Sequence, residues 1–301
     1  MQVAEKRNSA VSQLDAKKTK HQSQLWTVWL GLRKNRIAMF GAVLLAALVI
    51  SALIAPVVAP YDPLKTAIGD RLLAPSRAHL MGTDQFGRDT FSRVLYGGRT
   101  SLWLGIVAVS ISVFIGGVLG LISGYYGSAV DVLISRFIDL MLAMPRILLA
   151  LIIVFTLGVG IVNVMIAVGI SGIPGYARIV RSSVLSAREQ VYVEAALVVG
   201  VPNWRIMMRH ISPNVIAPVL VVATLGLGEA ILAAAGLSFL GLGARPPVIE
   251  WGYMISEGRD KLSVAWWLMT FPGIAIMLTV IAINLLGDGL RDALDPRLRS
   301  R

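Results

Sequence analysis

The 301-residue sequence contains no cysteine and only three histidines. Without cysteine, disulfides, thiolate catalysis and sulfur-ligated metals are excluded. The histidines are scattered and no His-Glu-x-x-His pattern occurs, which excludes the familiar zinc sites. A Gly-x-Ser-x-Gly nucleophile elbow is also missing. These absences point away from the common hydrolases and metalloenzymes.

The sequence also lacks a phosphate-binding P-loop. That loop requires Gly-Lys followed by Ser or Thr, and none of the seven lysines follows a glycine. Any use of ATP must therefore take place on another subunit.

Charged residues are scarce as well. They make up 15% of the chain, 56% is hydrophobic and the mean hydropathy is +0.73, whereas soluble domains are about one quarter charged. Apolar runs long enough to cross a bilayer recur along the chain. The sequence predicts an all-α integral membrane protein with about six transmembrane helices, at roughly 37–58, 102–124, 132–157, 160–176, 214–235 and 267–287.

The distribution of positive charge predicts the topology. Six spans place both termini on one side, and an inside amino terminus puts 17 of the 28 Lys and Arg residues inside and nine outside. We therefore expect both termini to be cytoplasmic and the net charge of +11 to reflect the positive-inside rule rather than nucleic-acid binding. The expected organisation is a basic cytoplasmic tail at 1–36 and a membrane domain at 37–301. Within the membrane domain we expect external segments at 59–99 and 236–266 and one internal loop at 177–212. The tail is expected to be mobile or to lie on anionic lipid.

A glycine stripe runs along the second predicted span. Gly116, Gly120 and Gly124 recur every four residues, which places them on one helix face. Small residues on one face let a neighbouring helix approach closely. We interpret the stripe as a helix-packing surface.

The internal loop 177–212 carries a pattern that differs from an ordinary connection. Helix formers run through Val199, Gly200 can end that helix, and Pro202 can begin another. These residues predict two short helices joined by a tight turn. Such a turn cannot face lipid, because its backbone groups would be left unpaired in hydrocarbon. We expect the loop to dock onto a cytoplasmic partner.

The residues of this loop resemble a known family. Glu194-Ala195-Ala196, the glycine six positions after the glutamate, and Ile211-Ser212-Pro213 are similar to the cytoplasmic loop of ATP-binding-cassette importer permeases. Ser212 departs from the pattern, which often has leucine there. The resemblance implies a coupling helix that seats in a groove of an ATPase, with its contact carried by Glu194, Ala195, Ala196, Gly200, Pro202, His210 and Pro213. The small alanines would permit close approach, the glycine the turn, and the glutamate a charged hydrogen bond.

Three further stretches resemble the dipeptide and oligopeptide branch of that family, and in particular its second type of permease. One follows the first span, one precedes the last span, and one lies at the carboxyl terminus. They are Gly82–Asp89 with Ser92-Arg93 and Tyr96-Gly97; Leu237–Gly243 with Pro246-Pro247 and Glu250-Trp251-Gly252; and Asn284–Asp292 with Leu294-Asp295-Pro296.

The resemblance implies a type I importer permease in the bacterial cytoplasmic membrane. The expected partners are a second, homologous permease, two ATP-binding subunits that hold ATP and Mg²⁺, and an extracytoplasmic solute-binding protein. This chain itself would bind no cofactor and perform no covalent chemistry. A dipeptide or oligopeptide is the expected solute, although the same branch includes importers of nickel chelates, opines, glutathione and oligosaccharides.

Two charged residues fall inside predicted spans, where an unpaired charge costs several kcal/mol. Arg146 follows Asp139 by seven residues, which would be two helical turns along one face, and Glu229 lies in the fifth span. In the functional interpretation both line the pore, where Arg146 meets the carboxylate of a zwitterionic peptide and Glu229 its ammonium. In the structural interpretation Arg146 pairs with Asp139 or with Glu229 and ties helices together.

A different class of function remains open on these residues. In a secondary transporter, Glu229 would carry a coupling proton. A third possible function is that of a purely structural membrane subunit. Neither explains the coupling-type loop, and the second half of the chain shows no echo of the first that an inverted repeat would give.

Overall fold

The computed structural model describes residues 32–33 and 35–294, and within that part of the chain every named element is a helix. Most of the basic segment 1–36 therefore lies outside the described residues, as does the end of the carboxyl-terminal signature. The helices that concern the bundle are α3 (Arg36–Leu53), α4 (Ala55–Val58), α5 (Thr90–Tyr126), α6 (Ser128–Leu142), α7 (Arg146–Leu157), α8 (Ile161–Arg188), α11 (Ser212–Phe239) and α13 (Trp267–Leu294).

The number of candidate spans agrees with the sequence. Five helical stretches are long and apolar enough to cross a membrane, namely α3, α5, α8, the stretch Asn203–Phe239 that contains α11, and α13. A sixth candidate is the pair α6 and α7, which are bent by 91° to each other. The prediction of an all-α membrane protein with about six spans is confirmed.

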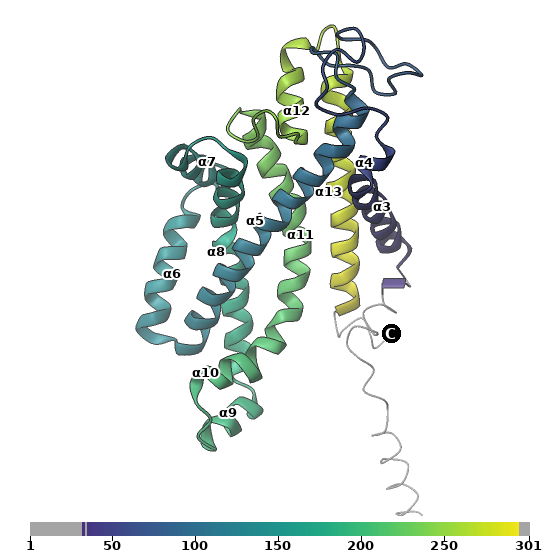
Figure 1. The fold of residues 1–301 in the computed structure, drawn as a ribbon. Helices are drawn as coiled ribbons and strands as arrows, with labels where there is room; N and C mark the ends of the chain where they lie inside the picture. The colour runs from purple at the N-terminus through teal and green to yellow at the C-terminus, as the bar shows by residue number, and fades with distance from the viewer. Residues whose placement is uncertain (1–31, 34, 295–301) are drawn as a thin grey trace, which may run out of the picture.

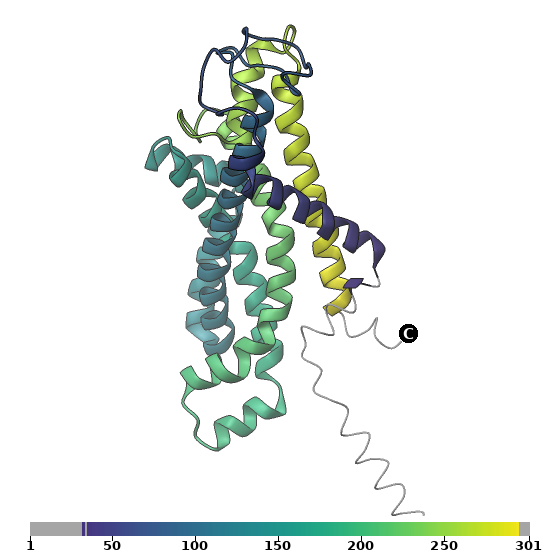
Figure 2. The ribbon, with the colours of Figure 1, turned by 45° about the vertical axis from the view of Figure 1, so that its right-hand side comes forward.

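The spans form an elongated bundle with two distinct ends (Figures 1 and 2). The segment 59–89 and helix α12 (Trp251–Gly258) cover one end, while α9 (Val191–Val198) and α10 (Asn203–Ile206) project from the other. The start of α3 lies beside the end of α13, where Asn35 Nδ2 donates to Asp292 Oδ2 at 3.4 Å. We refer below to the α9–α10 end and the α12 end.

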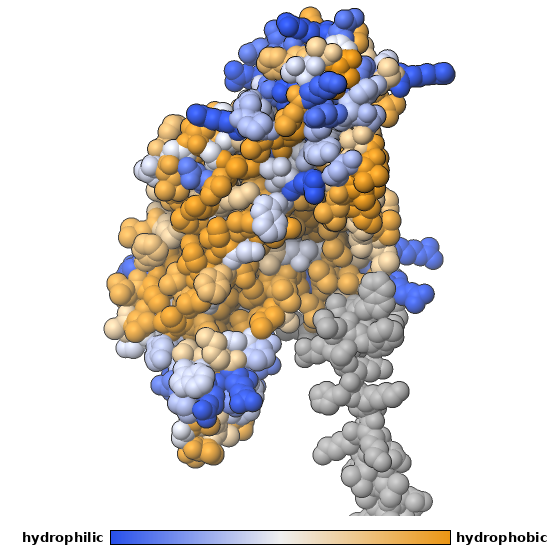
Figure 3. All heavy atoms as spheres, in the orientation of Figure 1, coloured by the Kyte–Doolittle hydropathy of each residue, from blue (hydrophilic) through white to orange (hydrophobic). Residues whose placement is uncertain are grey.

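The surface pattern fits this arrangement. A broad band of apolar side chains crosses the middle of the molecule, polar side chains gather above it at the α12 end, and polar and apolar side chains mix at the α9–α10 tip (Figure 3). Such a band on an elongated helical bundle is the surface that lipid or other spans cover.

Four helices are longer than their predicted spans: α11 and α13 extend a few residues beyond 214–235 and 267–287, and α5 and α8 extend furthest. α5 begins at Thr90 instead of 102, because Asp89 caps it and accepts a hydrogen bond from the Ser92 amide at 2.8 Å. α8 continues to Arg188, past the predicted end at 176. The loop expected at 177–212 is consequently confined to 189–211, and the segment expected to be external at 59–99 is confined to 59–89.

The third predicted span, 132–157, is not one helix. It breaks between Leu142 and Arg146, where Pro145 lies at the amino terminus of α7. Proline has no amide hydrogen to donate and it disfavours the helical conformation of the residue before it. The expectation of a continuous helix through this proline was wrong.

The glycine stripe packs α5 against α8, as predicted. A Cβ atom added at Gly120 would lie 2.5 Å from the carbonyl oxygen of Ala177, and one at Gly116 would lie 2.7 Å from that of Ile173. Only hydrogen fits between these backbones. The contact fixes α8, which leads directly into the α9–α10 end.

Candidate functional site

The segment between α8 and α11 forms a compact projection at one end of the bundle. α9 is followed by a turn at Gly200, then by α10 and a single π-helical turn, Met207–Ile211, that joins α11. Gly200 has φ +80°, a conformation that residues with a side chain rarely adopt. The two short helices and the tight turn expected from the sequence are present.

The inner face of this projection packs onto the ends of the spans. Val193, Ala196, Ile206 and Ile211 are buried in one apolar cluster with residues of α5 and α8. This cluster makes the projection part of the bundle rather than a loose loop.

Two hydrogen bonds join the projection to neighbouring spans. Tyr125 Oη, at the end of α5, donates to Asn203 Oδ1 of α10 at 2.9 Å. Asn214 Nδ2, in the first turn of α11, donates to Tyr192 Oη of α9 at 2.9 Å. Displacement of α9 or α10 would therefore be passed to α5 and α11.

The outer face of α9 and the turn after it is apolar and exposed. Val198 and Val199 are each 82% exposed, and Leu197 and Val191 are exposed beside them. Glu194 is exposed on the same helix, and its carboxylate has no ion pair or side-chain hydrogen bond within the described part of the chain. The face offers apolar contact around one free negative charge.

The residues predicted to dock are not all accessible. Glu194, Ala195, Gly200, Pro202 and Pro213 are exposed. In contrast, Ala196 is only 9% exposed and belongs to the inner cluster, and His210 is half-buried in the π-helical turn. Ala196 and His210 therefore pack inside the projection and are less accessible to a docking partner than the other predicted residues.

The second predicted group consists of Arg146 and Glu229, which lie on α7 and α11. Arg146 Nη1 donates to Glu229 Oε2 at 2.7 Å, joining the start of α7 to α11. The Arg146 side chain is 34% exposed and that of Glu229 is 69% exposed, so the pair lies at a surface of this chain. An exposed carboxylate in an apolar span must face a cavity or a partner.

The alternative pairing with Asp139 was wrong. The break at Pro145 turns Arg146 away from the axis of α6, so that the seven-residue spacing no longer places the two side chains on one face. Asp139 instead accepts from Arg178 Nη2 of α8 at 2.7 Å. Asp131 accepts from Arg181 of the same helix. Each acidic residue of α6 is therefore paired with an arginine of α8.

A buried ion cluster at the α12 end was missed by the sequence analysis. Asp84 accepts from Arg88 Nε and Arg93 Nη1, and Glu257 accepts from Arg88 Nη2 at 3.0 Å and Arg93 Nη2 at 2.6 Å. Burial disfavours the charge of Arg88, but Asp84 and Glu257 outweigh burial and raise its pKa above the ordinary value. The cluster fastens the segment 59–89 to α12. Its only sequence signal was the dense charge in the stretch that resembles importer permeases.

Glu250 is a second buried acid at this end. Its carboxylate caps α12 by accepting from the amides of Gly252 at 2.8 Å and Tyr253 at 2.9 Å, and it also accepts from Ser101 Oγ of α5. Burial raises the pKa of Glu250 although these hydrogen bonds favour the charged form. Glu250 thus joins α12 to the start of the second span.

None of the described acidic and histidine residues gather in groups of three that could hold a metal ion. This part of the chain offers surfaces for binding: an exposed apolar face at one end, an exposed ion pair between α7 and α11, and a cap held by buried charges at the other end.

Comparison with known proteins agrees with this geometry. Residues 116–300 match the family described as the binding-protein-dependent transport system inner membrane component. Residues 23–75 match the N-terminal TM domain of oligopeptide transport permease C. Together the two matches cover most of the chain.

Three relatives align over nearly their whole length. The dipeptide transport system permease protein DppC of Alkalihalophilus pseudofirmus is 48% identical over 89% of this chain and 88% of its own. The di/tripeptide transport system permease protein DppC of Pseudomonas aeruginosa is 43% identical over 93% and 94%. The glutathione transport system permease protein GsiD of Pectobacterium atrosepticum is 44% identical over 90% and 91%.

Two solved structures share the fold. A chain of the MetNI methionine ABC transporter in an inward-facing conformation has a TM-score of 0.54 at 17% identity, over 67% of this chain and 97% of that chain. An amino acid ABC transporter crystallised with histidines has a TM-score of 0.50 at 19% identity, over 67% and 94%. The chain, a multi-pass membrane protein, therefore belongs to the family of binding-protein-dependent transport system inner membrane components, in the branch of dipeptide and oligopeptide permeases of ABC transporters.

Proposed function

We propose that this chain forms half of the translocation pathway of an ATP-driven importer for dipeptides or oligopeptides in the bacterial cytoplasmic membrane. A second, similar permease completes the pathway, two ATPase subunits bind at the α9–α10 end, and a solute-binding protein delivers peptide at the α12 end. The names of the relatives support the solute class, and the fold of the structural neighbours supports the architecture.

The observation that carries the proposal is the outer face of α9. It lies beyond the apolar band, so lipid does not cover it, yet it exposes Val198 and Val199 almost fully. Exposed apolar side chains around a charged one are typical of a protein interface. The α9–α10 end is also the end that the positive-inside rule places in the cytoplasm, where ATPases work.

The contacts that hold the α9–α10 projection to the spans support a role in coupling ATPase movement to transport. The buried cluster and the Tyr125–Asn203 hydrogen bond hold α10 to α5, so that movement of docked ATPases is passed to the spans. ATP binding draws the two docking elements together and opens the pathway away from the cytoplasm, and hydrolysis resets it.

The pair Arg146 and Glu229 supports a place for the peptide. Glu229 uses one oxygen for Arg146 and exposes most of its side chain. A zwitterionic peptide can compete for both members, since its carboxylate suits the guanidinium and its ammonium suits the carboxylate. We propose that the pair lines the pathway and opens as peptide passes.

Docking is tested by recovery of ATPases with tagged chain from native membranes in mild detergent. Val198→Asp places a second negative charge on the docking face, and we expect it to abolish recovery of the ATPases while the second permease is retained. Val264→Asp is the matched control, because Val264 is also an exposed apolar residue but lies at the α12 end. Undiminished ATPase recovery with Val198→Asp overturns the assignment of the docking face.

The pathway is tested by peptide uptake into proteoliposomes that contain the complete complex. We expect Glu229→Gln and Arg146→Gln to raise the KM for peptides with free termini more than for peptides blocked at both ends. Equal effects on both kinds of peptide would contradict a contact with the termini. Uptake that follows a proton gradient without ATP, and disappears in Glu229→Gln, would instead establish a proton-coupled transporter.

A further inference from the structure

A polar cavity of about 700 Å³ opens at the α12 end, and its lining includes neither the residues of the α9–α10 projection nor Arg146 and Glu229. Its wall is formed by α4, by the segment that follows α4, by the first turns of α5 and by the loop before α12. Arg99, Thr100 and Tyr96 contribute from α5, and Asp62 contributes from the segment. Tyr61 also lines the cavity, but its hydroxyl already donates to Ala78 O at 3.1 Å. The cavity thus brings together one cation, one anion and the hydroxyl groups of Tyr96 and Thr100.

The two charged side chains are available for a ligand. Arg99 is exposed and forms no ion pair or hydrogen bond within the described part of the chain. Asp62 Oδ1 accepts from the Leu64 amide at 2.9 Å, and Asp62 is not ion-paired within the same residues. A cation and an anion in one cavity that are not paired with each other offer a site for a molecule that carries both charges.

The cavity adjoins the end of the apolar run of α5. α5 has 37 residues and is about 55 Å long, whereas the hydrocarbon core of a bilayer is about 30 Å thick. Arg99 comes just before the apolar run that begins at Leu102, and Trp103, one turn further along the same face, is 60% exposed. Arginine and tryptophan at that position mark the interface between hydrocarbon and water.

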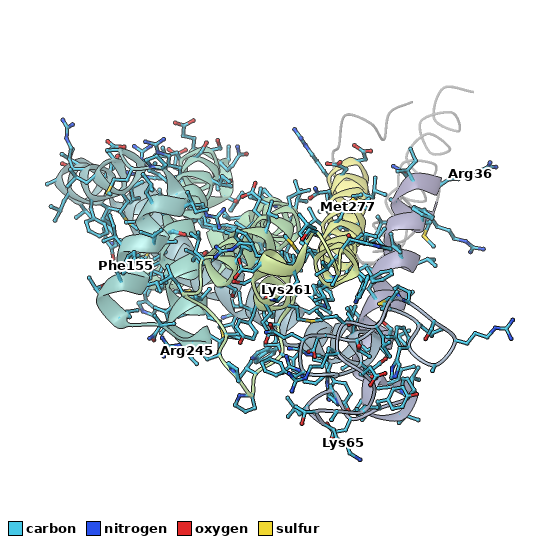
Figure 4. All side chains as sticks on the ribbon, turned by 90° about the horizontal axis from the view of Figure 1, so that it is seen from above. Arg36, Lys65, Phe155, Arg245, Lys261 and Met277 are labelled. Atoms are coloured by element: carbon cyan, nitrogen blue, oxygen red, sulfur yellow. The ribbon has the colours of Figure 1, made fainter. Side chains whose placement is uncertain are left out.

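The rim of the cavity next to α4 is apolar. Pro56 and Ala59 line the cavity, and Val57 between them is 86% exposed, with Val58 exposed beside it. Viewed from above, the side chain of Lys65, just after this segment, extends away from the bundle (Figure 4). A ligand in the cavity would therefore have apolar surface on the membrane side and charged groups around its polar part.

We propose that the cavity binds the headgroup of phosphatidylethanolamine. The phosphate is bound by Arg99 with support from Thr100 and Tyr96, the primary ammonium is bound by Asp62, and the acyl chains run along Val57 and Trp103. Phosphatidylglycerol lacks the ammonium and is repelled by Asp62, while the trimethylated ammonium of phosphatidylcholine has no N–H to donate. Bound lipid would fix the first span against the second.

The test uses the complete transport complex, delipidated in mild detergent and titrated with phosphatidylethanolamine, phosphatidylglycerol or phosphatidylcholine. Native mass spectrometry counts the lipid retained. We expect the unaltered complex to retain phosphatidylethanolamine in preference, and Arg99→Gln and Asp62→Asn each to weaken its binding about tenfold, as loss of one charge-assisted hydrogen bond predicts.

Two controls match the charges removed. Arg77→Gln and Asp70→Asn alter exposed residues of the same segment that do not line the cavity, and we expect them to bind lipid normally. Asp62→Asn should also reduce the preference over phosphatidylglycerol, an effect that a merely structural role of Asp62 would not produce. Equal retention of the three lipids by the unaltered complex, or normal binding by both variants, overturns the proposal.

The subunit composition measured in the same spectra separates this inference from the proposed function. Loss of the second permease in Arg99→Gln, with lipid binding unchanged, would overturn the lipid site and assign the cavity to a subunit interface. Retention of the ATPases in every variant is expected, because the cavity and the docking face lie at opposite ends of the bundle.

Discussion

The close contact between α5 and α8 allows a matched pair of substitutions on one helix. Gly117 and Gly120 both lie inside α5, but a Cβ atom at Gly117 meets nothing within 4 Å, whereas one at Gly120 lies 2.5 Å from Ala177 O and 2.8 Å from Val180 Cβ. We therefore compare Gly117→Ala with Gly120→Ala.

The two substitutions share one effect on stability and differ in another. Each replaces glycine by alanine inside a helix, which favours the helix by up to about 1 kcal/mol, and this contribution cancels in the comparison. Gly120→Ala in addition forces two helices apart against a backbone oxygen, and overpacking of this kind costs about 1–3 kcal/mol. We expect Gly120→Ala to be less stable than Gly117→Ala by that amount.

The measurement that tests this difference is the free energy of unfolding of each variant in bicelles, obtained by steric trapping. A difference of about 1.4 kcal/mol corresponds to a tenfold change in the ratio of folded to unfolded chain, which is well within reach of the assay. If the two variants were equally stable, α5 and α8 would not approach as closely as the structure has them, and the reasoning would fail.

Three further predictions concern the ends of the bundle. Asp84→Asn removes one of the two negative charges that face the buried Arg88 and Arg93, and it should destabilise the chain by about 3 kcal/mol or more. Asp260→Asn, in an exposed ion pair, should change thermal stability little. Similar melting temperatures of the two variants would contradict the buried cluster. Because burial raises the pKa of Glu250, its contribution to stability is fully present below its unfolded pKa and declines as pH rises toward the folded value. Glu250→Gln should therefore gain thermal stability relative to the unaltered chain between acidic and neutral pH, and parallel pH profiles would refute this. Tyr125→Phe removes the hydrogen bond to Asn203. The ATPases should remain bound, while the amount of peptide taken up per ATP hydrolysed should fall by about fivefold. An unchanged amount of peptide per ATP would show that this hydrogen bond does not couple ATP hydrolysis to transport.

Features that depend on neighbouring residues were predictable. The apolar runs fixed the number of candidate spans, because about 20 apolar residues in a row have few other uses. Gly200 and Pro202 marked the turn between two short helices, since their backbone preferences act locally. The four-residue spacing of Gly116, Gly120 and Gly124 identified a packing face without naming the helix that packs there.

The partners of charged side chains were decided only by the tertiary structure. Arg88 and Arg93 looked like charges of a polar external segment, but they are buried against Glu257, which lies more than 160 residues further along the chain. Arg146 could have paired with Asp139 until the bend at Pro145 turned it toward Glu229. Ion pairing depends on distances of a few ångströms, and a break in one helix changes those distances for every residue beyond it. The sequence by itself determined which segments are apolar enough to span a membrane, and the packing of the helices determined which charges meet.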